Sequence, residues 1–411
     1  MIDRPYLLAM TLPCYEDAAG TRSLQELWHK DLVEHLAQIR HLTLAAPVEH
    51  GGTPDKTLPI DHSSLPGELT FVDLPPCRST AETVRHLPTI AGRLWRAVGR
   101  ASIVHGNAGG WPLSFGWLAI PMAKLRGKFT LTNVESGSWR LGFQRPWRLK
   151  PFLEACAYEG MGRLIVNLSD VAFFTHAGYR ESMLLPWRRA RGHVVSASWI
   201  KPANILDQGP AEAHAGAKAG GPERPLRVVF AATYKPSKGW RVLLDAARIL
   251  EQRGVAVQLD LYGQGPDQPE VARRAEAIGG SVAARICPPL DYGPPFFDML
   301  LDHDLMVVPS LSDEQPRVIY DCFARALPVI ATATAGNAQC VTDGQTGRLV
   351  PVGDAAALAD AIEWAARNRP RLAAMGVAAL DVARSLTHDQ MHARRAAIVA
   401  EAYRAKRGQP A

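Results

Sequence analysis

Two carboxylates, Asp313 and Asp321, stand eight residues apart in the second half of the chain. The first lies in an acidic, proline-containing loop after a short apolar run, Leu305–Val308, and the second lies on an amphipathic helix that we predict to begin near Val318. In parallel α/β sheets, ligands bind where strands end and helices begin, so both acids and the helix N–H groups are placed to meet one ligand. A helix cap at Asp313 or Glu314 and a solvated Asp321 would explain the same pattern equally well.

Residues suited to an anionic ligand follow two earlier predicted strands. Lys235 and Lys238 lie between an apolar strand and a helix, where ammonium groups and free N–H groups both favour a diphosphate. Gly263 and Gly265 follow the next strand, and glycine allows a tight turn that leaves room for a ligand. Each pattern alone is also typical of an ordinary surface turn. Together they predict that successive strand ends meet at one edge of a sheet.

A parallel sheet is needed to bring these residues together, and the chain alternates strand and helix patterns throughout. In the first half, apolar runs predict strands at 6–10, 41–47, 69–74, 102–105, 129–133 and 171–175, with helices at 24–38 and 80–100. In the second half, strands are predicted at 226–231, 257–262, 284–287, 305–308 and 327–331, and helices at 240–253, 268–277, 355–367, 371–386 and 389–407. We therefore predict an α/β protein with two Rossmann-like domains facing across a cleft.

A length of 411 residues also predicts more than one domain. Residues 207–223 are small, polar and rich in Gly, Ala and Pro, a composition typical of a linker or mobile excursion. We therefore expect an N-terminal domain at 1–205, a linker at 206–224, a C-terminal domain at 225–388, and a C-terminal helix and tail at 389–411.

Basic residues are concentrated in the first domain. Between Glu82 and Lys201 there are 17 Lys/Arg and six Asp/Glu, whereas the whole chain has a formal net charge of +6. Tryptophans are interleaved with these cations at Trp95, Trp139, Trp147, Trp187 and Trp199. This pattern is typical of surfaces that bind anionic membranes, although a solvated basic face with packed tryptophans would look the same. We expect no nucleic-acid partner, because no recognised nucleic-acid-binding motif is present.

The six cysteines are scattered, without a C-x-x-C pair, which is typical of a reduced, cytosolic protein. The N-terminus lacks the basic and apolar regions of a signal peptide. The longest apolar stretch, Trp111–Leu125, is shorter than a membrane span. We therefore expect a cytoplasmic protein that attaches peripherally to the inner face of a membrane.

Five sequence blocks follow one another in the second domain: SKG (237–239), YGQGP (262–266), PSLSDEQPRVIYD (309–321), ALPVIAT (326–332) and DGQTGRLVPVGD (343–354). In this order and spacing they resemble the nucleotide-binding domain of family 4 glycosyltransferases, which are retaining enzymes of the GT-B fold. The resemblance implies a GT-B architecture in which the C-terminal helix crosses back to the first domain. It also implies a nucleotide-diphosphate sugar as donor, with no metal and no cofactor, because lysines and helix N-termini can neutralise the diphosphate.

The resemblance assigns roles to the acidic segment. It implies that Asp321 binds the donor ribose and that Asp313, or the longer Glu314 beside it, lies near the transferred sugar. Lys238 would stabilise the leaving diphosphate, where charge develops as the sugar departs, with Lys235 beside it. The rest of the donor site would be formed by Gly263, Gly265, Gln315, Pro316, Arg317 and Val318. The family has Glu at both acidic positions and an Arg where this chain has Thr233.

The first domain resembles the family only loosely. A loop after the first strand, with Gly20 and Thr21, would close over the donor diphosphate. Where the family often places a histidine near the sugar, this chain has Glu135, whose alternative roles are a helix cap or an ion pair with Arg140. His105 is a second candidate polar contact, although a histidine at a strand end is more often a structural hydrogen-bond partner.

The sequence therefore predicts a retaining glycosyltransferase that moves a sugar from a nucleotide-diphosphate sugar to a saccharide or polyprenyl-linked acceptor, in cell-surface polysaccharide biosynthesis. A sugar-nucleotide epimerase or a glycoside phosphorylase of the same fold is an alternative. So is a non-catalytic GT-B-like binding subunit, because two Glu have become Asp and the family's Arg and His are missing. The identities of the donor and the acceptor do not follow from the sequence.

Overall fold

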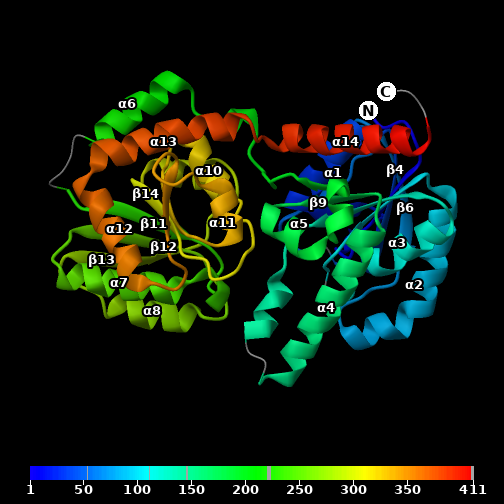
Figure 1. Ribbon diagram of the computed structural model, residues 1–411, viewed down its shortest axis with the longest axis horizontal. Coiled ribbons are helices and arrows are strands. Elements are labelled where there is room, and N and C mark those ends of the chain that lie inside the picture. Colours follow the sequence, from blue (N-terminus) through cyan, green and yellow to red (C-terminus); the bar gives the residue numbers. More distant parts are fainter. Residues whose placement is uncertain (53, 111, 145–146, 220–223, 409–411) are drawn as a thin grey trace. The chain divides into compact units, whose positions relative to one another are not determined.

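The computed structural model describes residues 1–411 except 53, 111, 145–146, 220–223 and 409–411. Contacts divide the chain into two compact units: Met1–Ser196 together with Asp389–Ala411, and Ala197–His388. Both units are α/β, as the alternation of strand and helix patterns predicts (Figure 1). The C-terminal helix α14 (His388–Lys406) packs in the first unit, so the prediction that it crosses back is confirmed.

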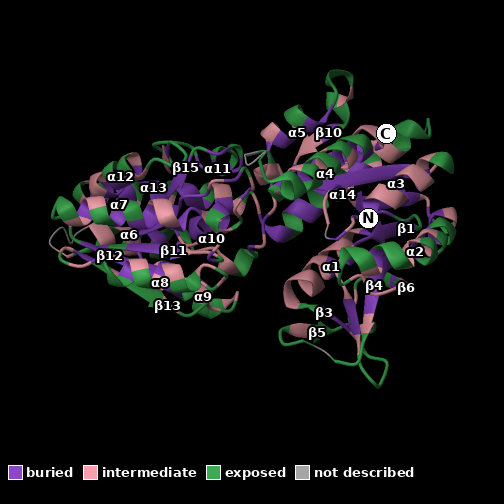
Figure 2. Ribbon diagram, turned by 90° about the horizontal axis from the view of Figure 1, so that it is seen from below, coloured by how far each residue is buried: buried purple, intermediate pink, exposed green. Residues whose placement is uncertain are grey.

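The first unit is built on a ten-stranded sheet. Its parallel strands, in spatial order, are β10 (Gly192–Val194), β9 (Val171–Phe174), β8 (Phe129–Val134), β7 (Ile103–Asn107), β1 (Tyr6–Ala9), β4 (His41–His50) and β6 (Glu68–Leu74). A small extension continues from the end of β4 through β2 (Cys14–Glu16), β3 (Arg22–Gln25) and β5 (Thr57–Pro59). Exposed loops surround this extension (Figure 2).

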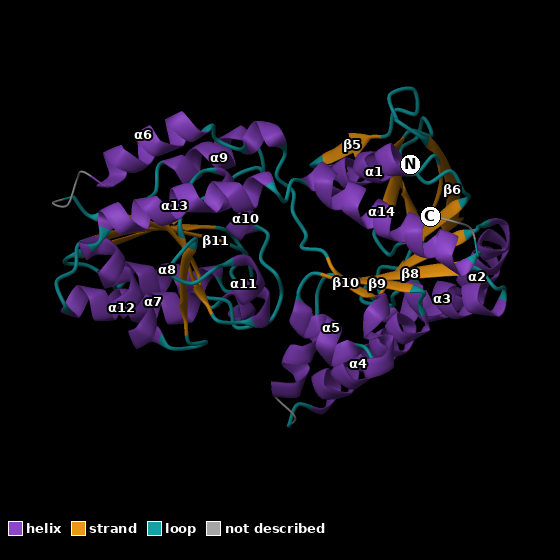
Figure 3. Ribbon diagram, turned by 45° about the horizontal axis from the view of Figure 1, so that its top comes forward, coloured by secondary structure: helices purple, strands orange, loops and turns teal. Residues whose placement is uncertain are grey.

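Helices cover both faces of this sheet (Figure 3). On one face lie α2 (Thr80–Arg100), α3 (Gly116–Leu125), α4 (Leu149–Leu168) and α5 (Ala177–Met183). On the other face lie α1 (Glu26–Gln38) and α14. Strand β1 shows the division, because Leu7 packs in the core under α2 and α3 while Tyr6 points to the side of α1 and α14.

The second unit is a six-stranded sheet in which every pair is parallel. Its strands are ordered β13 (Val282–Cys287), β12 (Val257–Tyr262), β11 (Leu226–Ala231), β14 (Leu305–Val308), β15 (Val329–Thr332) and β16 (Gly347–Val350). The covering helices are α7 (Trp240–Gln252), α8 (Gln268–Glu276), α9 (Pro294–Leu301), α10 (Val318–Ala324), α11 (Ala335–Cys340), α12 (Ala355–Arg367) and α13 (Arg369–Arg384). Strands β12 and β13 follow on one side of β11, and β14, β15 and β16 follow on the other, so the strand order reverses between β11 and β14, which makes this point the topological switch of a doubly wound sheet.

Side chains cap the starts of α2 and α12. Ser79 accepts the N–H of Glu82 at the start of α2 over 3.2 Å, and the Glu82 carboxylate accepts the N–H of Arg78 over 2.7 Å. Asp354 accepts the N–H of Ala357 over 2.9 Å at the start of α12. These bonds satisfy N–H groups that the first helical turn leaves without a partner.

The expected linker at 206–224 is wrong for the residues that the structure describes, because it contains helix α6 (Gln208–Ala219). Small side chains make a close approach to α13 feasible, and Ala211 is fully buried against Ala326 and Leu380. The His214 ring, about one turn further along α6, bonds the carbonyl of Leu301 over 2.7 Å. Composition misled the prediction because alanine suits a tight helix interface as well as a flexible segment. Residues 220–223 of the expected linker lie outside the described residues.

The loop that we expected after the first strand, at residues 11–21, is also partly wrong. It contains the strand β2 and the turn that leads into β3. Strands of three and four residues give too little alternation to be recognised in a sequence.

Candidate functional site

Four loops of the second unit meet at the carboxyl edge of its sheet, because β11, β12, β14 and β15 are parallel. They connect these strands to α7, α8, α10 and α11. The loop after β14 carries the two candidate carboxylates and lies beside the loop after β11, where the Leu311 N–H donates to the Ser237 carbonyl over 2.8 Å. The sequence blocks that are separated along the chain are therefore brought together.

Glycines let these loops touch. Gly239 has a φ of +72°, and a Cβ at this position would lie 1.7 Å from the carbonyl oxygen of Pro309. A Cβ at Gly263 would lie 2.0 Å from the Ala232 carbonyl oxygen, and one at Gly265 would lie 2.6 Å from that of Tyr234. The space beside Gly263 and Gly265 is therefore filled by the neighbouring loop, not left open for a ligand as the sequence suggested.

Lys238 is held by an acid of the neighbouring loop. Its Nζ lies 3.2 Å from Oε2 of Glu314, and both side chains are largely shielded from solvent. Lys235 is half-buried at the start of the short helix η4 (Pro236–Lys238). A diphosphate that bound Lys238 would therefore have to displace the Glu314 carboxylate from its ammonium group.

The adjacent acids diverge. Asp313 is exposed, and its Oδ1 accepts the N–H of Ala335 over 3.2 Å at the start of α11. Glu314 turns toward Lys238 instead. The structure therefore distinguishes two residues between which the sequence could not choose: Asp313 belongs to the α11 end of the site and Glu314 to the lysine end.

The residues after Glu314 anchor the loop to the first residues of the second unit. The Gln315 amide accepts the N–H and donates to the carbonyl of Ala197, each over 2.9 Å. The Arg317 guanidinium lies 4.7 Å from the centre of the Trp199 ring. Pro316 is half-buried between them, and Val318 begins α10. This part of the loop is thus held by the protein itself.

Trp199 also stacks on His388, with ring centres 5.3 Å apart, and the His388 N–H donates to the carbonyl of Ile200 over 2.8 Å. The chain enters the second unit at Ala197 and leaves it at His388. The entering and leaving segments are therefore bonded to each other.

Asp321 is buried in α10, one turn from its start, with 4% of its surface exposed. The Tyr292 hydroxyl donates to its Oδ1 over 2.8 Å. Burial raises the pKa of Asp321 to about 7, against the opposing effects of the Tyr292 hydrogen bond and the Arg317 charge. Tyr292 was not expected from the sequence, because its loop precedes α9 and carries no recognisable motif.

The first unit holds a cavity of about 930 Å³ at the carboxyl ends of its central strands. Met10, Pro47, Asn107 and Asn133 at or beyond the ends of β1, β4, β7 and β8 line it, together with an aromatic group formed by Trp28, Trp117, Trp139 and Tyr158. Large, largely preformed concave spaces of this kind are the usual binding sites of small ligands.

The polar ends of the cavity's aromatic side chains bond to the protein. The indole N–H of Trp117 donates to the Ala108 carbonyl over 2.8 Å, and that of Trp139 donates to Glu159 over 2.9 Å. Tyr158 stacks on Trp139 with ring centres 5.9 Å apart. With their polar ends fixed, these rings present ordered apolar surface to the cavity.

Glu135 lines this cavity, whereas His105 is not one of the described residues that line it. Glu135 pairs with Arg395 of α14 at 3.5 Å, so the expected pairing with Arg140 is wrong. Arg140 binds Glu159 instead, with two bonds of 2.9 and 2.8 Å. His105 is buried and bonds the Tyr6 hydroxyl over 2.9 Å.

Gly20 and Thr21 form the exposed turn between β2 and β3, and neither is among the described residues that line the cavity. The Thr21 N–H donates to Asp17 Oδ1 over 2.8 Å, and the Gly20 N–H donates to the Asp17 carbonyl over 3.1 Å. The expected diphosphate donors are thus bonded within the turn. The residues after β1 that reach the cavity are Met10–Pro13.

The five tryptophans of the basic region do not share one face. Trp199 belongs to the second unit, Trp139 lines the cavity, and Trp95 lies on Arg126 at 3.9 Å. Trp147 and Trp187 are 76% and 74% exposed.

Trp187 borders a groove of about 700 Å³ between α4 and the short helix η2 (Pro186–Arg191), which we call the α4–η2 groove. Its apolar floor includes Leu164 and Leu185, and arginines flank it at Arg163, Arg188 and Arg189. Among the described residues, no helix is long and apolar enough to cross a membrane.

Residues 225–368 match the family described as "Glycosyl transferases group 1". The chain is 32% identical over 206 residues to a D-inositol 3-phosphate glycosyltransferase of Streptomyces coelicolor, covering 48% of this chain and 44% of that protein. It is 32% identical over 167 residues to a phosphatidyl-myo-inositol mannosyltransferase of Mycobacterium leprae, covering 39% and 44%. The chain thus matches less than half the length of these curated relatives.

Two solved structures resemble nearly the whole chain. HepE from Anabaena, solved with UDP, has a TM-score of 0.66 at 12% identity and covers 97% of this chain and 100% of that chain. The sucrose-phosphate synthase of Thermosynechococcus elongatus has a TM-score of 0.67 at 18% identity and covers 98% and 100%. Residues 225–368 therefore resemble the group 1 glycosyl transferases, as the ordered sequence blocks indicate, and the chain has the GT-B fold of these solved structures.

Proposed function

We propose that this protein is a retaining glycosyltransferase that uses a nucleotide-diphosphate sugar and transfers the sugar to a saccharide acceptor. The observation that carries the proposal is the arrangement at the carboxyl edge of the second sheet, where the loops and helix starts carry Lys238, Asp313, Glu314 and Asp321 within the segment that matches the family. Donor binding at this edge follows the general behaviour of doubly wound sheets.

In this proposal, Asp321 accepts hydrogen bonds from the donor ribose. A carboxylate accepts two hydroxyl groups well only when it is ionised, and Tyr292 already donates to one of its oxygens. With the pKa of Asp321 at about 7, a bound ribose would favour the ionised form. Donor binding is therefore expected to release protons near and below pH 7, and few above about pH 8, where the free carboxyl is already ionised.

Lys238 would neutralise the diphosphate. Without a ligand its ammonium group pairs with Glu314, so the arriving phosphate would displace that carboxylate and free it beside the transferred sugar. As the bond between sugar and phosphate breaks, negative charge grows on the leaving diphosphate, where Lys238 and Lys235 would stabilise it. Lysines supply this charge without a metal ion, and we propose that the donor site works in this way.

The cavity of the first unit is the proposed acceptor site. Aromatic rings such as Trp139 and Tyr158 suit the apolar C–H faces of a sugar, while Glu49, Glu135 and Glu154 can accept its hydroxyl groups. The HepE structures with UDP and with UDP-glucose make uridine-diphosphate sugars the first donors to test.

We further propose that the acceptor is lipid-linked and that the protein meets an anionic membrane from the cytoplasmic side. The α4–η2 groove combines an apolar floor with flanking arginines, and Trp187 at its border is largely exposed, as is Trp147 before the start of α4. Such combinations bind acyl chains and anionic headgroups together.

The direct test measures donor hydrolysis and sugar transfer with Asp321→Ala and Lys238→Ala, with the exposed Lys201→Ala as a matched control. Both site variants should lose at least about 90% of activity, because each removes an interaction with the donor. Full activity in both would contradict the site. Nucleotide binding without transfer to any acceptor in the unaltered protein would favour a non-catalytic binding subunit.

A further inference from the structure

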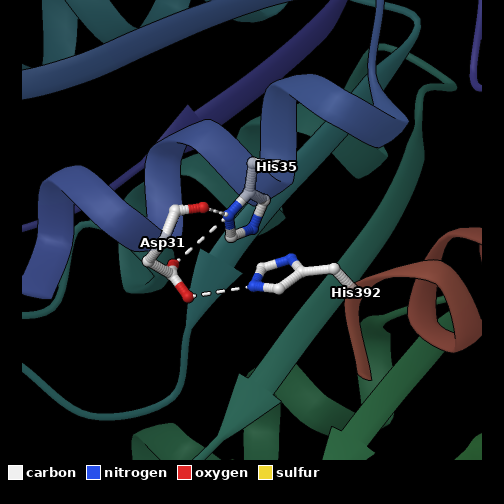
Figure 4. A group of neighbouring side chains, drawn as sticks. All are labelled: Asp31, His35 and His392. Carbon is white, nitrogen blue, oxygen red and sulfur yellow. Dashed lines mark hydrogen bonds and ion pairs between the residues drawn. The ribbon is translucent and has the colours of Figure 1, made fainter. Parts of the chain in front are cut away.

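Asp31, His35 and His392 converge in the first unit (Figure 4). Asp31 and His35 come from α1, and His392 comes from the first turns of α14. The Asp31 carboxylate lies 3.2 Å from the His35 ring and 3.0 Å from the His392 ring through its two oxygens. One ligand atom of each residue lies within 4.8 Å of the other two.

The helix geometry explains the arrangement. Residues four apart share one face of an α-helix, so Asp31 and His35 both point from α1 toward α14. The three side chains are 15%, 11% and 3% exposed. Because His35 and His392 also contact each other, with ring centres 4.5 Å apart, the group is a compact cluster and not three independent surface residues.

Two imidazoles and one carboxylate are a favoured donor set for zinc and related divalent transition metals. Metal–ligand bonds of about 2.0–2.2 Å place tetrahedral donors about 3.3 Å apart, close to the two contacts of the Asp31 carboxylate. Three protein ligands would leave a fourth position open.

A small cavity of about 30 Å³ adjoins the cluster where a fourth ligand would lie. His35, His105, Asn133 and His392 line it. The buried Nε2 of His105 and Oδ1 of Asn133 have no hydrogen-bond partner among the described residues. A water molecule fits such a space, and these two atoms would bond it. The cavity is therefore polar, roomy enough for one water, and beside the two histidines.

One nearby charge opposes a cation. Arg395 also lines this cavity, but its guanidinium pairs with Glu135 at 3.5 Å. Asp31 supplies a second negative charge within the cluster itself. The local charge thus reduces affinity without excluding a divalent ion.

We propose that Asp31, His35 and His392 form a site for a zinc-class divalent metal ion that fastens α14 to α1. The ion would replace the proton that links the carboxylate to His392, and it would draw Nδ1 of His35 away from the Asp31 carbonyl, which it now contacts over 2.9 Å. Its role is structural: it joins the C-terminal helix to the first unit and takes no part in binding the donor diphosphate.

The test uses the full-length protein, stripped with a chelator and then dialysed against micromolar zinc. Metal content is measured by mass spectrometry, coordination by the visible spectrum of the cobalt-substituted protein, and stability by thermal unfolding. We expect one zinc per chain, a tetrahedral cobalt spectrum and a rise in Tm of several degrees, because the ion binds only the folded state. Both His35→Gln and His392→Gln should weaken zinc binding by about 100-fold or more.

His50→Gln is the matched control, since this histidine is exposed and outside the cluster. It should keep one zinc and the full rise in Tm. Glutamine retains a hydrogen-bonding group, and circular dichroism reports whether each variant folds. Absence of stoichiometric zinc and of a Tm shift in the unaltered protein would overturn the proposal. So would equal zinc content in folded His35→Gln, His392→Gln and His50→Gln proteins.

Discussion

The phenolic hydroxyl of Tyr292, a partly buried residue, donates over 2.8 Å to Oδ1 of the buried Asp321. Asp321 was expected from the sequence to be available to a ribose, yet it is 4% exposed and already has one protein donor. The bond fixes the orientation of the carboxylate before any ligand arrives. Its burial also makes the carboxylate sensitive to pH.

The first prediction concerns stability and pH. Burial raises the pKa of Asp321 from 3.8 to about 7, so the folded protein holds this proton more tightly than the unfolded chain. The contribution of Asp321 is thus most favourable below about pH 4 and is lost as pH rises to about 7, by on the order of 4 kcal/mol. Asp321→Asn should match the unaltered protein near pH 4 and be more stable at pH 7 and above, as measured by urea unfolding. Equal stability differences at both pH values would contradict the shift.

The second prediction separates the roles of Lys238 and Glu314. Removing the ammonium group in Lys238→Ala should weaken nucleoside diphosphate binding by about 10- to 100-fold in calorimetry, because a charge-assisted bond is lost. Glu314→Gln removes the competing carboxylate and should bind the diphosphate as tightly or several-fold more tightly.

Sugar transfer by the Glu314→Gln protein then decides whether this acid acts near the sugar. If sugar transfer falls while diphosphate binding is unchanged, Glu314 takes part in the reaction. If Glu314→Gln weakens diphosphate binding as much as Lys238→Ala does, the proposal that the diphosphate displaces Glu314 from Lys238 is wrong.

The third prediction concerns the cavity of the first unit. Trp139→Ala removes a ring that lines the cavity and stacks with Tyr158, and it should raise the acceptor KM by about three- to tenfold. Donor hydrolysis should not change. Trp95→Ala is the matched control, because that ring lies on Arg126 outside the cavity. An equal effect of both variants would mean that stability, not acceptor contact, is being measured.

The fourth prediction concerns the membrane. The protein should cosediment with vesicles that contain phosphatidylglycerol, more strongly than with pure phosphatidylcholine, and added salt should weaken this binding. Replacing both Trp147 and Trp187 by Ser should reduce it on the order of tenfold, because both rings are exposed beside basic residues. If the double variant binds vesicles as strongly as the unaltered protein, Trp147 and Trp187 are not part of the membrane-binding surface.

The fifth prediction concerns α6. Ala211 is fully buried against α13, so Ala211→Leu should overpack the contact and lower the unfolding free energy by about 1–3 kcal/mol. Ala213→Leu, on the exposed side of the same helix, should have little effect. If chemical denaturation gives both variants the same unfolding free energy as the unaltered protein, residues 208–219 are a mobile linker and the prediction is wrong.

Apolar runs predicted the second sheet well, because strands buried on both faces read as continuous hydrophobic segments. Strands 226–231, 257–262 and 305–308 have the predicted limits, whereas the run at 327–331 begins its strand two residues later, at Val329. Pro328 explains the delay, since it has no N–H to donate to a neighbouring strand.

The side-chain partners could not be predicted, because they come from residues far apart in the chain. Tyr292 and Asp321 are 29 positions apart, and Lys238 and Glu314 are 76 apart. The turn at Gly20 was misplaced for a different reason: the short strands around it leave no periodic signal. Order and spacing of motifs thus indicated the candidate site, while tertiary packing decides which of its groups are bonded to each other.

The paired segments at the border of the second unit have a mechanical consequence. The Trp199 ring contacts both His388 and Arg317, and Gln315 is bonded twice to Ala197. Direct side-chain contacts therefore link the acidic loop to the segments that enter and leave the second unit. A change of backbone conformation at either connection would strain these contacts, and with them the loop that carries Asp313 and Glu314.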